Sequence, residues 1–194
     1  MQPGRGCSRF GTVCSVERHS LRNEEARLTT KKNILSIVYT RLTSGPTYSF
    51  KETLHDSVPL ACIGVYTIWR GEEFVYVGIA GRNLDLSIEH KRMRGVRDRL
   101  DSHRSGRRSG DQFAVYVCDR FVLADLTPED IMRVAAGELS LDAKTRLYIH
   151  QHLSYRFAEV DTYSDAMKIE VALARGESPS GKPILNPGRP GKLL

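Results

Sequence analysis

Two tyrosines stand beside glycines in this 194-residue chain, within the tripeptides Gly-Val-Tyr (64–66) and Tyr-Val-Gly (76–78). Both tripeptides lie in short runs rich in β-branched and aromatic residues, and the Arg-Gly-Glu-Glu stretch between them (70–73) predicts a β-hairpin. Because side chains alternate along a strand, Tyr66 and Tyr76 can lie near each other on one face of the hairpin. Glycine in a strand removes side-chain bulk and often marks a close approach by a ligand or by backbone.

Three further side chains could join the tyrosines in phosphodiester hydrolysis. Arg99 and His103 share one face of a helix predicted over 95–105, and Glu170 lies within a helix predicted over 164–175. The reaction needs an activated water, neutralisation of the phosphate and assistance to the leaving oxygen. Arginine suits the phosphate, histidine suits proton transfer, and a carboxylate suits a hard divalent cation.

The order of these elements resembles the GIY-YIG nuclease family, which is named for two tripeptides in its first hairpin. In that family a helix with an arginine, often followed four residues on by a histidine, comes next, as Arg99 and His103 do here. A later helix carries a glutamate and a C-terminal segment carries an asparagine, which here are Glu170 and Asn186. The resemblance covers about residues 60–188.

The chain departs from the family pattern in two places. Val65 replaces the usual isoleucine, which changes packing little. The linker between Gly78 and the arginine helix is longer than in compact members, so Arg82 or Arg97 could be taken for the family arginine. Only Arg99 has a histidine four residues later and an apolar residue directly after it.

The resemblance implies a role for each tyrosine and for the metal. Tyr66 would be the general base or would orient the attacking water, and Tyr76 would support it. A free tyrosine has a pKa of about 10, so we expect Arg99 and a metal to lower the pKa of Tyr66. Glu170 would bind Mg²⁺ or Mn²⁺.

The roles of His103 and Asn186 leave alternatives open. His103 would assist proton transfer or orient a tyrosine hydroxyl, and either it or Tyr66 could be the general base. Asn186 would hold the substrate backbone or brace the site. Each of these residues also has a plainer interpretation, namely a helix-face histidine and an asparagine before a proline in a turn.

We expect a small α+β domain with a mainly antiparallel three-stranded sheet, the fold of GIY-YIG nucleases, and an N-terminal extension. The sheet should contain strands 64–68, 74–79 and 113–118. Helices near 95–105 and 164–175 should flank it.

The predicted organisation is an N-terminal extension over 1–50, partly disordered or helical, and a nuclease domain over 60–190. An insertion over 119–160 should contain a helix over 141–153 and a short strand over 155–160.

Positive charge is concentrated in a basic segment, residues 81–110, which hold nine Lys and Arg against four Asp and Glu. The whole chain has a net charge of +6. Clustered cations favour a polyanionic partner, because each Lys or Arg placed against a phosphate releases counterions. We therefore predict binding of nucleic acid, and of double-stranded DNA in particular. The candidate binding residues are Arg82, Arg97, Arg104, Arg107 and Arg108.

The leading hypothesis is a metal-dependent endonuclease that cleaves DNA, with a restriction-like or repair-like role. The alternatives are a binding module of the same fold without catalysis, or a nuclease acting on RNA. Cleavage of both strands of a duplex would favour a homodimer with two-fold symmetry. The chain has no apolar run of roughly 18 residues and no signal-peptide pattern, so we expect a cytoplasmic protein without membrane contact.

Overall fold

The computed structural model describes residues 35–51, 53–54, 56–82, 84 and 95–186. The chain divides into two compact units, Met1–Ile37 and Val38–Leu194, and the candidate site belongs to the second. Most of the expected N-terminal extension, and residues 85–94 of the basic segment, lie outside the described residues.

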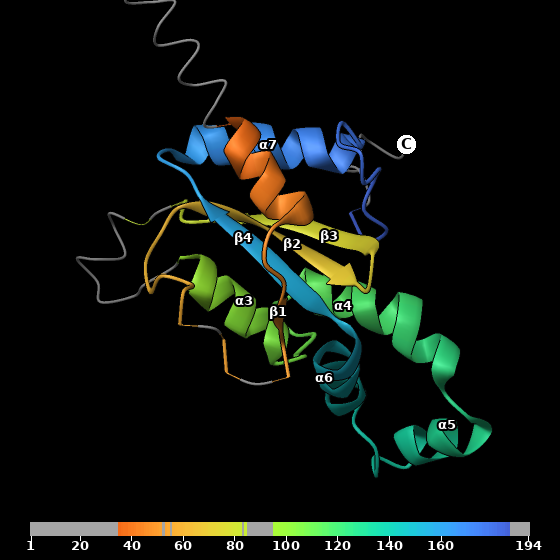
Figure 1. Ribbon diagram of the computed structural model, residues 1–194. Helices are drawn as coiled ribbons and strands as arrows, with labels where there is room; N and C mark the ends of the chain where they lie inside the picture. The colour runs from red at the N-terminus through yellow and green to blue at the C-terminus, as the bar shows by residue number, and fades with distance from the viewer. Residues whose placement is uncertain (1–34, 52, 55, 83, 85–94, 187–194) are drawn as a thin grey trace, which may run out of the picture. The chain divides into compact units, whose positions relative to one another are not determined.

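The second unit is built on a four-stranded antiparallel sheet with the strand order β1-β4-β2-β3 (Figure 1). The expected hairpin is confirmed and forms one side of it. The strands are β1 (Tyr48–Ser49), β2 (Gly64–Arg70), β3 (Glu73–Ala80) and β4 (Ser154–Glu159). The α+β class is therefore correct, but the expected count of three strands is wrong, because the short β1 pairs with β4.

The expected strand over 113–118 is also wrong. These residues form α4 (Gln112–Val117), which continues into a π-helical turn, η1 (Cys118–Val122). The run is apolar enough for a buried strand, yet its buried side chains follow a helical spacing: Phe113, Ala114, Val117, Cys118, Phe121 and Val122. A short apolar run does not distinguish a strand from a buried helix, and here the helix forms. The strand that pairs with β2 on the side away from β3 is β4.

Helices cover both faces of the sheet (Figure 1). On one side lie α3 (Val96–Arg104), α4 and α6 (Leu141–His152), and on the other lies α7 (Tyr163–Arg175), which packs on β2 and β3. The helices expected near 95–105, 141–153 and 164–175 are thus confirmed to within two residues at each end.

The main core lies between the sheet and the helices α3, α4 and α6. Tyr66 and Ile68 of β2 and Tyr155 of β4 face it, and Leu100 and Phe113 close it from α3 and α4. Across the sheet, α7 buries a stripe of three side chains: Ala166, Ile169 and Leu173. Burial on both faces fixes the register of β2, because a shift by one residue would turn every side chain to the wrong side.

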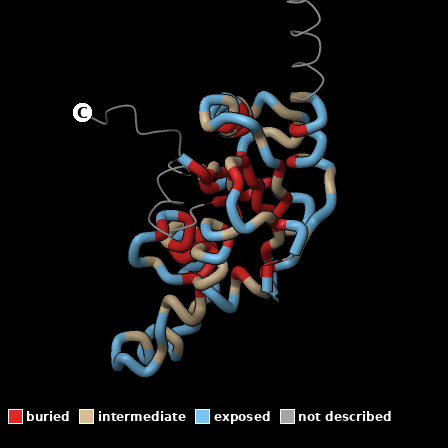
Figure 2. Tube along the Cα trace, turned by 90° about the vertical axis from the view of Figure 1, so that its left-hand side faces the viewer, coloured by how far each residue is buried: buried red, intermediate tan, exposed pale blue. Residues whose placement is uncertain are grey.

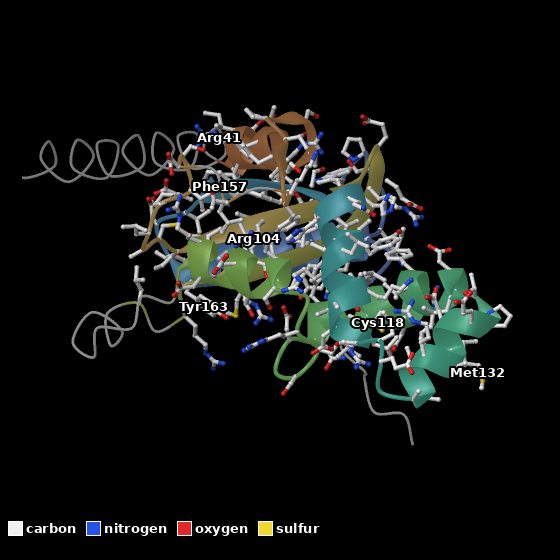
Figure 3. The ribbon with its side chains drawn as sticks, turned by 90° about the horizontal axis from the view of Figure 1, so that it is seen from below. Arg41, Arg104, Cys118, Met132, Phe157 and Tyr163 are labelled. Carbon is white, nitrogen blue, oxygen red and sulfur yellow. The ribbon has the colours of Figure 1, made fainter. Side chains whose placement is uncertain are left out.

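The exception to this burial is α5 (Pro128–Ala135), which follows the 3₁₀ turn η2 (Leu123–Asp125) and has no buried residue. The exposed residues of α5 appear at the bottom of Figure 2, and Met132 lies at the outer end of α5 in Figure 3. Met132 is 71% exposed. Among the described residues, no helix has the length and apolar character needed to cross a membrane.

Candidate active site

The hairpin register brings the two tyrosines of the predicted site onto one face. Tyr66 pairs with Gly78, and two positions along Ile68 pairs with Tyr76, so both tyrosines face α3 and α4. Their ring centroids are 6.4 Å apart. The expectation that a tyrosine from each strand would share one face is met by this geometry.

Gly78 and Gly64 allow close approaches that no other residue would. A Cβ atom added to Gly78 would overlap the hydroxyl oxygen of Tyr66 and lie 2.6 Å from its Cζ. The side chain of Tyr66 therefore lies directly across Gly78. A Cβ on Gly64 would lie 2.6 Å from the carbonyl oxygen of Ala158 and 2.8 Å from Cγ2 of Val96, so this glycine lets β4 and α3 pack against β2.

His103 reaches this face from α3. Its helix buries Val96, Leu100 and His103 at the expected spacing, and the imidazole is fully buried. Its Nε2 lies 2.9 Å from the Tyr66 hydroxyl oxygen, within hydrogen-bond distance. The ring centroid is 5.9 Å from that of Tyr76. The histidine is therefore part of the site and not a solvent-exposed residue of the helix face.

Asp111 completes this group, and sequence reasoning did not find it. Its Oδ2 lies 2.6 Å from Nδ1 of His103, and its Oδ1 accepts a hydrogen bond of 3.2 Å from the backbone N–H of Phe113 at the start of α4. Only 2% of the side chain is exposed. A possible signal was its place as an N-cap, directly before an apolar run of helical spacing.

Burial sets the protonation states of the site. It lowers the pKa of His103 from its usual 6.5, against the opposing effect of Asp111, so the imidazole is neutral at pH 7. Burial alone would raise the pKa of Asp111, but its interactions with His103 and Arg99 outweigh burial and hold it below the usual value. This carboxyl is therefore ionised.

The expectation that the pKa of Tyr66 is lowered is wrong for the protein alone. Burial raises its pKa well above 10, and the nearby Tyr76 adds to this, while Arg99 acts in the lowering direction without prevailing. Burial also raises the pKa of Tyr76 to about 12. Both tyrosines are therefore neutral phenols at pH 7, because the burial created by α3 and α4 outweighs the nearby cation.

Arg99 lies one turn before His103 and is the most accessible member of the group. Its side chain is 37% exposed, and its Nη2 lies 3.8 Å from Oδ1 of Asp111. Its charge and hydrogen bonding also act on Tyr66. An arginine that touches the buried group on one side and solvent on the other can receive a phosphate from outside.

Glu170 lies at the margin of the group rather than within it. It comes from α7, on the other face of the sheet from α3 (Figure 1). The carboxylate is partly buried and acts on Tyr76, whose pKa it helps to raise. Among the described residues, no three His, Cys, Asp or Glu side chains cluster as a metal site would require. A cation at Glu170 would therefore complete its coordination with water and substrate oxygens, as Mg²⁺ commonly does.

Asn186 braces β3. Its Oδ1 accepts a hydrogen bond of 2.7 Å from the N–H of Val77, and its Nδ2 donates one of 2.8 Å to the carbonyl of Val77. The N–H groups of Ile184 and Leu185 donate to the carbonyls of Phe74 and Val75. Residues 184–186 thus run along the outer edge of β3 and hold the strand that carries Tyr76. Of the two roles expected for Asn186, these contacts correspond to bracing.

The five arginines of the predicted binding surface differ in their surroundings. Three of them form ion pairs: Arg97 with Asp56, Arg104 with Asp101, and Arg108 with Asp142. Figure 3 shows Arg104 on α3. Arg82 and Arg107 are exposed. Ion pairs at partly exposed positions such as these contribute little to stability.

Comparison of the chain with protein-family models, with curated proteins and with solved structures finds no match.

Proposed function

We propose that this protein is a metal-dependent endonuclease that hydrolyses phosphodiester bonds in DNA, similar to GIY-YIG nucleases. The observation that carries the proposal is the buried hydrogen bond between the Tyr66 hydroxyl and His103, with Arg99 beside it. A neutral phenol bonded to a neutral imidazole is a proton path, and an adjacent arginine is a ligand for the phosphate that would need it.

In the proposed reaction a water molecule gives a proton to the Tyr66 oxygen as its own oxygen attacks the phosphorus. Tyr66 passes its hydroxyl proton to His103, whose Nε2 lies 2.9 Å away. The bond from phosphorus to the leaving oxygen breaks, and that oxygen takes a proton from solvent. After the product has left, His103 returns its proton to solvent through the Tyr66 hydroxyl, which restores the starting state. Because Tyr66 ends the step protonated, it never has to exist as a free phenolate, which its raised pKa forbids at neutral pH.

Two other side chains stabilise charge in this scheme. Arg99 neutralises the phosphate oxygens with a planar guanidinium that stays charged throughout. Tyr76, a phenol with a pKa of about 12, keeps its proton and donates a hydrogen bond to the phosphate or the attacking water. Asn186 serves Tyr76 indirectly, because it fixes the backbone of the adjacent Val77.

Glu170 is the proposed metal ligand, and a single partly buried carboxylate fits a cation that keeps most of its waters. When bound, Mg²⁺ or Mn²⁺ would supply positive charge to the phosphate and leaving oxygens. Nucleic acid is the proposed substrate because the basic segment carries a charge of +5, from nine basic and four acidic residues. The resemblance to GIY-YIG nucleases favours DNA over RNA.

A cleavage panel tests this proposal. Plasmid, junction, flap, single-stranded DNA and matched RNA substrates are incubated with the protein and Mg²⁺, and binding is measured in parallel. We expect cleavage of at least one DNA substrate, its loss in Glu170→Ala with binding retained, and normal cleavage in the control variant Glu138→Ala, whose side chain is exposed and lies outside the site. Binding without cleavage by the unaltered protein would identify a binding module, and cleavage of RNA alone would reassign the substrate.

A further inference from the structure

Asp111 is a buried carboxylate that the proposed reaction does not yet use. It lies in the turn before α4, yet its Oδ2 is 2.6 Å from Nδ1 of His103, eight residues earlier in the chain. We infer that Asp111 is a positioning residue, which holds His103 in the one tautomer that can accept a proton from Tyr66. The inference rests on the proposed function.

The hydrogen-bond partners of the His103 imidazole determine this tautomer. An ionised carboxylate only accepts hydrogen bonds, so Nδ1 of His103 carries the proton that points at Asp111. The imidazole is neutral, so Nε2 has a free lone pair and accepts the hydrogen bond from the Tyr66 hydroxyl. The proton of Tyr66 therefore points along the direction in which the reaction would move it.

The charge of Asp111 matters as much as its shape. When His103 takes the proton it becomes an imidazolium in a fully buried position. Among the described residues, the titratable and charged groups that face it are Tyr66 from β2, Tyr76 from β3, Arg99 from its own helix and Asp111 from the start of α4. Of these four, only Asp111 carries negative charge, so it alone offsets the charge that forms on the ring.

Helix capping does not account for this arrangement. Oδ1 of Asp111 caps α4 through the N–H of Phe113, and an asparagine would do that equally well. The second oxygen is directed at His103, and Arg99 Nη2 lies 3.8 Å from the capping oxygen. A capping residue has no need of the contact with His103, whereas a positioning residue requires it.

The substitution Asp111→Asn separates the two roles. To keep the cap, the Asn oxygen must still accept from Phe113, which places the amide nitrogen against Nδ1 of His103. That nitrogen donates, so it favours the tautomer with the proton on Nε2. Tyr66 can then no longer pass its proton to His103. We expect the single-turnover cleavage rate to fall about 10²–10⁴-fold, the usual range for acid–base assistance, with the cap retained.

The decisive readout is the imidazole ¹⁵N spectrum of His103, which reports the tautomer without any cleavage. In the unaltered protein we expect the proton on Nδ1, and in Asp111→Asn a shift toward Nε2. A proton on Nε2 in the unaltered protein overturns the inference even if the variant fails to fold. An Asp111→Asn variant that keeps both the His103 tautomer and the cleavage rate of the unaltered protein also overturns it. A protein that cleaves none of the panel substrates refutes the proposed function instead, and leaves the tautomer result standing.

Combining Asp111→Asn with Tyr66→Phe distinguishes action through the relay from general damage. If Asp111 acts through His103 and Tyr66, the second substitution adds little to the loss already caused by the first. If the fold-loss in rate of the double variant equals the product of the losses of the two single variants, the inference is contradicted, because Asp111 then acts independently of Tyr66.

Discussion

The substitution Tyr66→Phe removes one hydroxyl from the site and little else. In the structure that hydroxyl lies across Gly78 and bonds Nε2 of His103, and the side chain is 1% exposed. The remaining ring still fills the core, so the fold is kept. The cost to stability is that of leaving a buried imidazole nitrogen without its partner, about 1–3 kcal/mol.

The cost to the reaction is larger. Without the hydroxyl, no path leads from the attacking water to His103, and the loss is that of acid–base assistance, about 10²–10⁴-fold in rate. At about 1.4 kcal/mol for each factor of ten, this is a barrier increase of about 3–6 kcal/mol. Tyr76→Phe should cost less, because Tyr76 only donates a hydrogen bond in this scheme.

Single-turnover cleavage at saturating protein measures this loss apart from binding, and urea unfolding measures the stability cost. Tyr163→Phe, which removes the same hydroxyl from the first turn of α7, is the matched control and should behave as the unaltered protein does. The reasoning is refuted if Tyr66→Phe cleaves at a near-native rate while His103→Ala does not. Such a result would make the histidine the direct base.

Three further predictions concern pH, space and charge. Burial lowers the pKa of His103 below 6.5, so the cleavage rate should stay level from pH 7 to 9 and fall only at acid pH, where the imidazole becomes protonated. A tenfold rise in rate per pH unit between 7 and 9 would instead indicate a phenolate base. Gly78→Ala should displace the Tyr66 hydroxyl, which should reduce the cleavage rate and lower the free energy of unfolding in urea by about 1–3 kcal/mol. A variant with unchanged rate and stability would show that the close approach is not required. Arg107→Glu should weaken DNA binding and flatten its dependence on salt by roughly one phosphate contact, whereas the matched exposed control Arg133→Glu on α5 should not; equal slopes for both variants would remove Arg107 from the binding surface.

Local patterns predicted the parts of the fold that depend on local sequence. The alternating residues of 64–79 specify the hairpin, and the apolar spacing of Val96, Leu100 and His103 specifies α3. The same reasoning was wrong for 113–118, where strongly apolar residues conceal a helical spacing until the capping role of Asp111 is considered.

The rest of the site depends on contacts between elements that are distant in sequence. Asp111 meets His103 only because the turn after α3 folds back, so its N-cap position in the sequence did not indicate this contact. Asn186 reaches Val77 across 109 residues, and its bracing role follows from that pairing rather than from residue type. The pKa of Tyr66 was predicted in the wrong direction, because the charge of Arg99 is visible in the sequence but the burial of Tyr66 is not.

In the proposed reaction, Tyr66 and His103 act as one proton path in phosphodiester hydrolysis. Single-turnover cleavage rates of Tyr66→Phe, His103→Gln and the double variant, on the DNA substrate that the unaltered protein cleaves fastest, test it most directly. We expect the double variant to be about as slow as the slower single variant, because either change alone interrupts the path. Rate losses that multiply across the two substitutions would show that Tyr66 and His103 act independently and would contradict the claim.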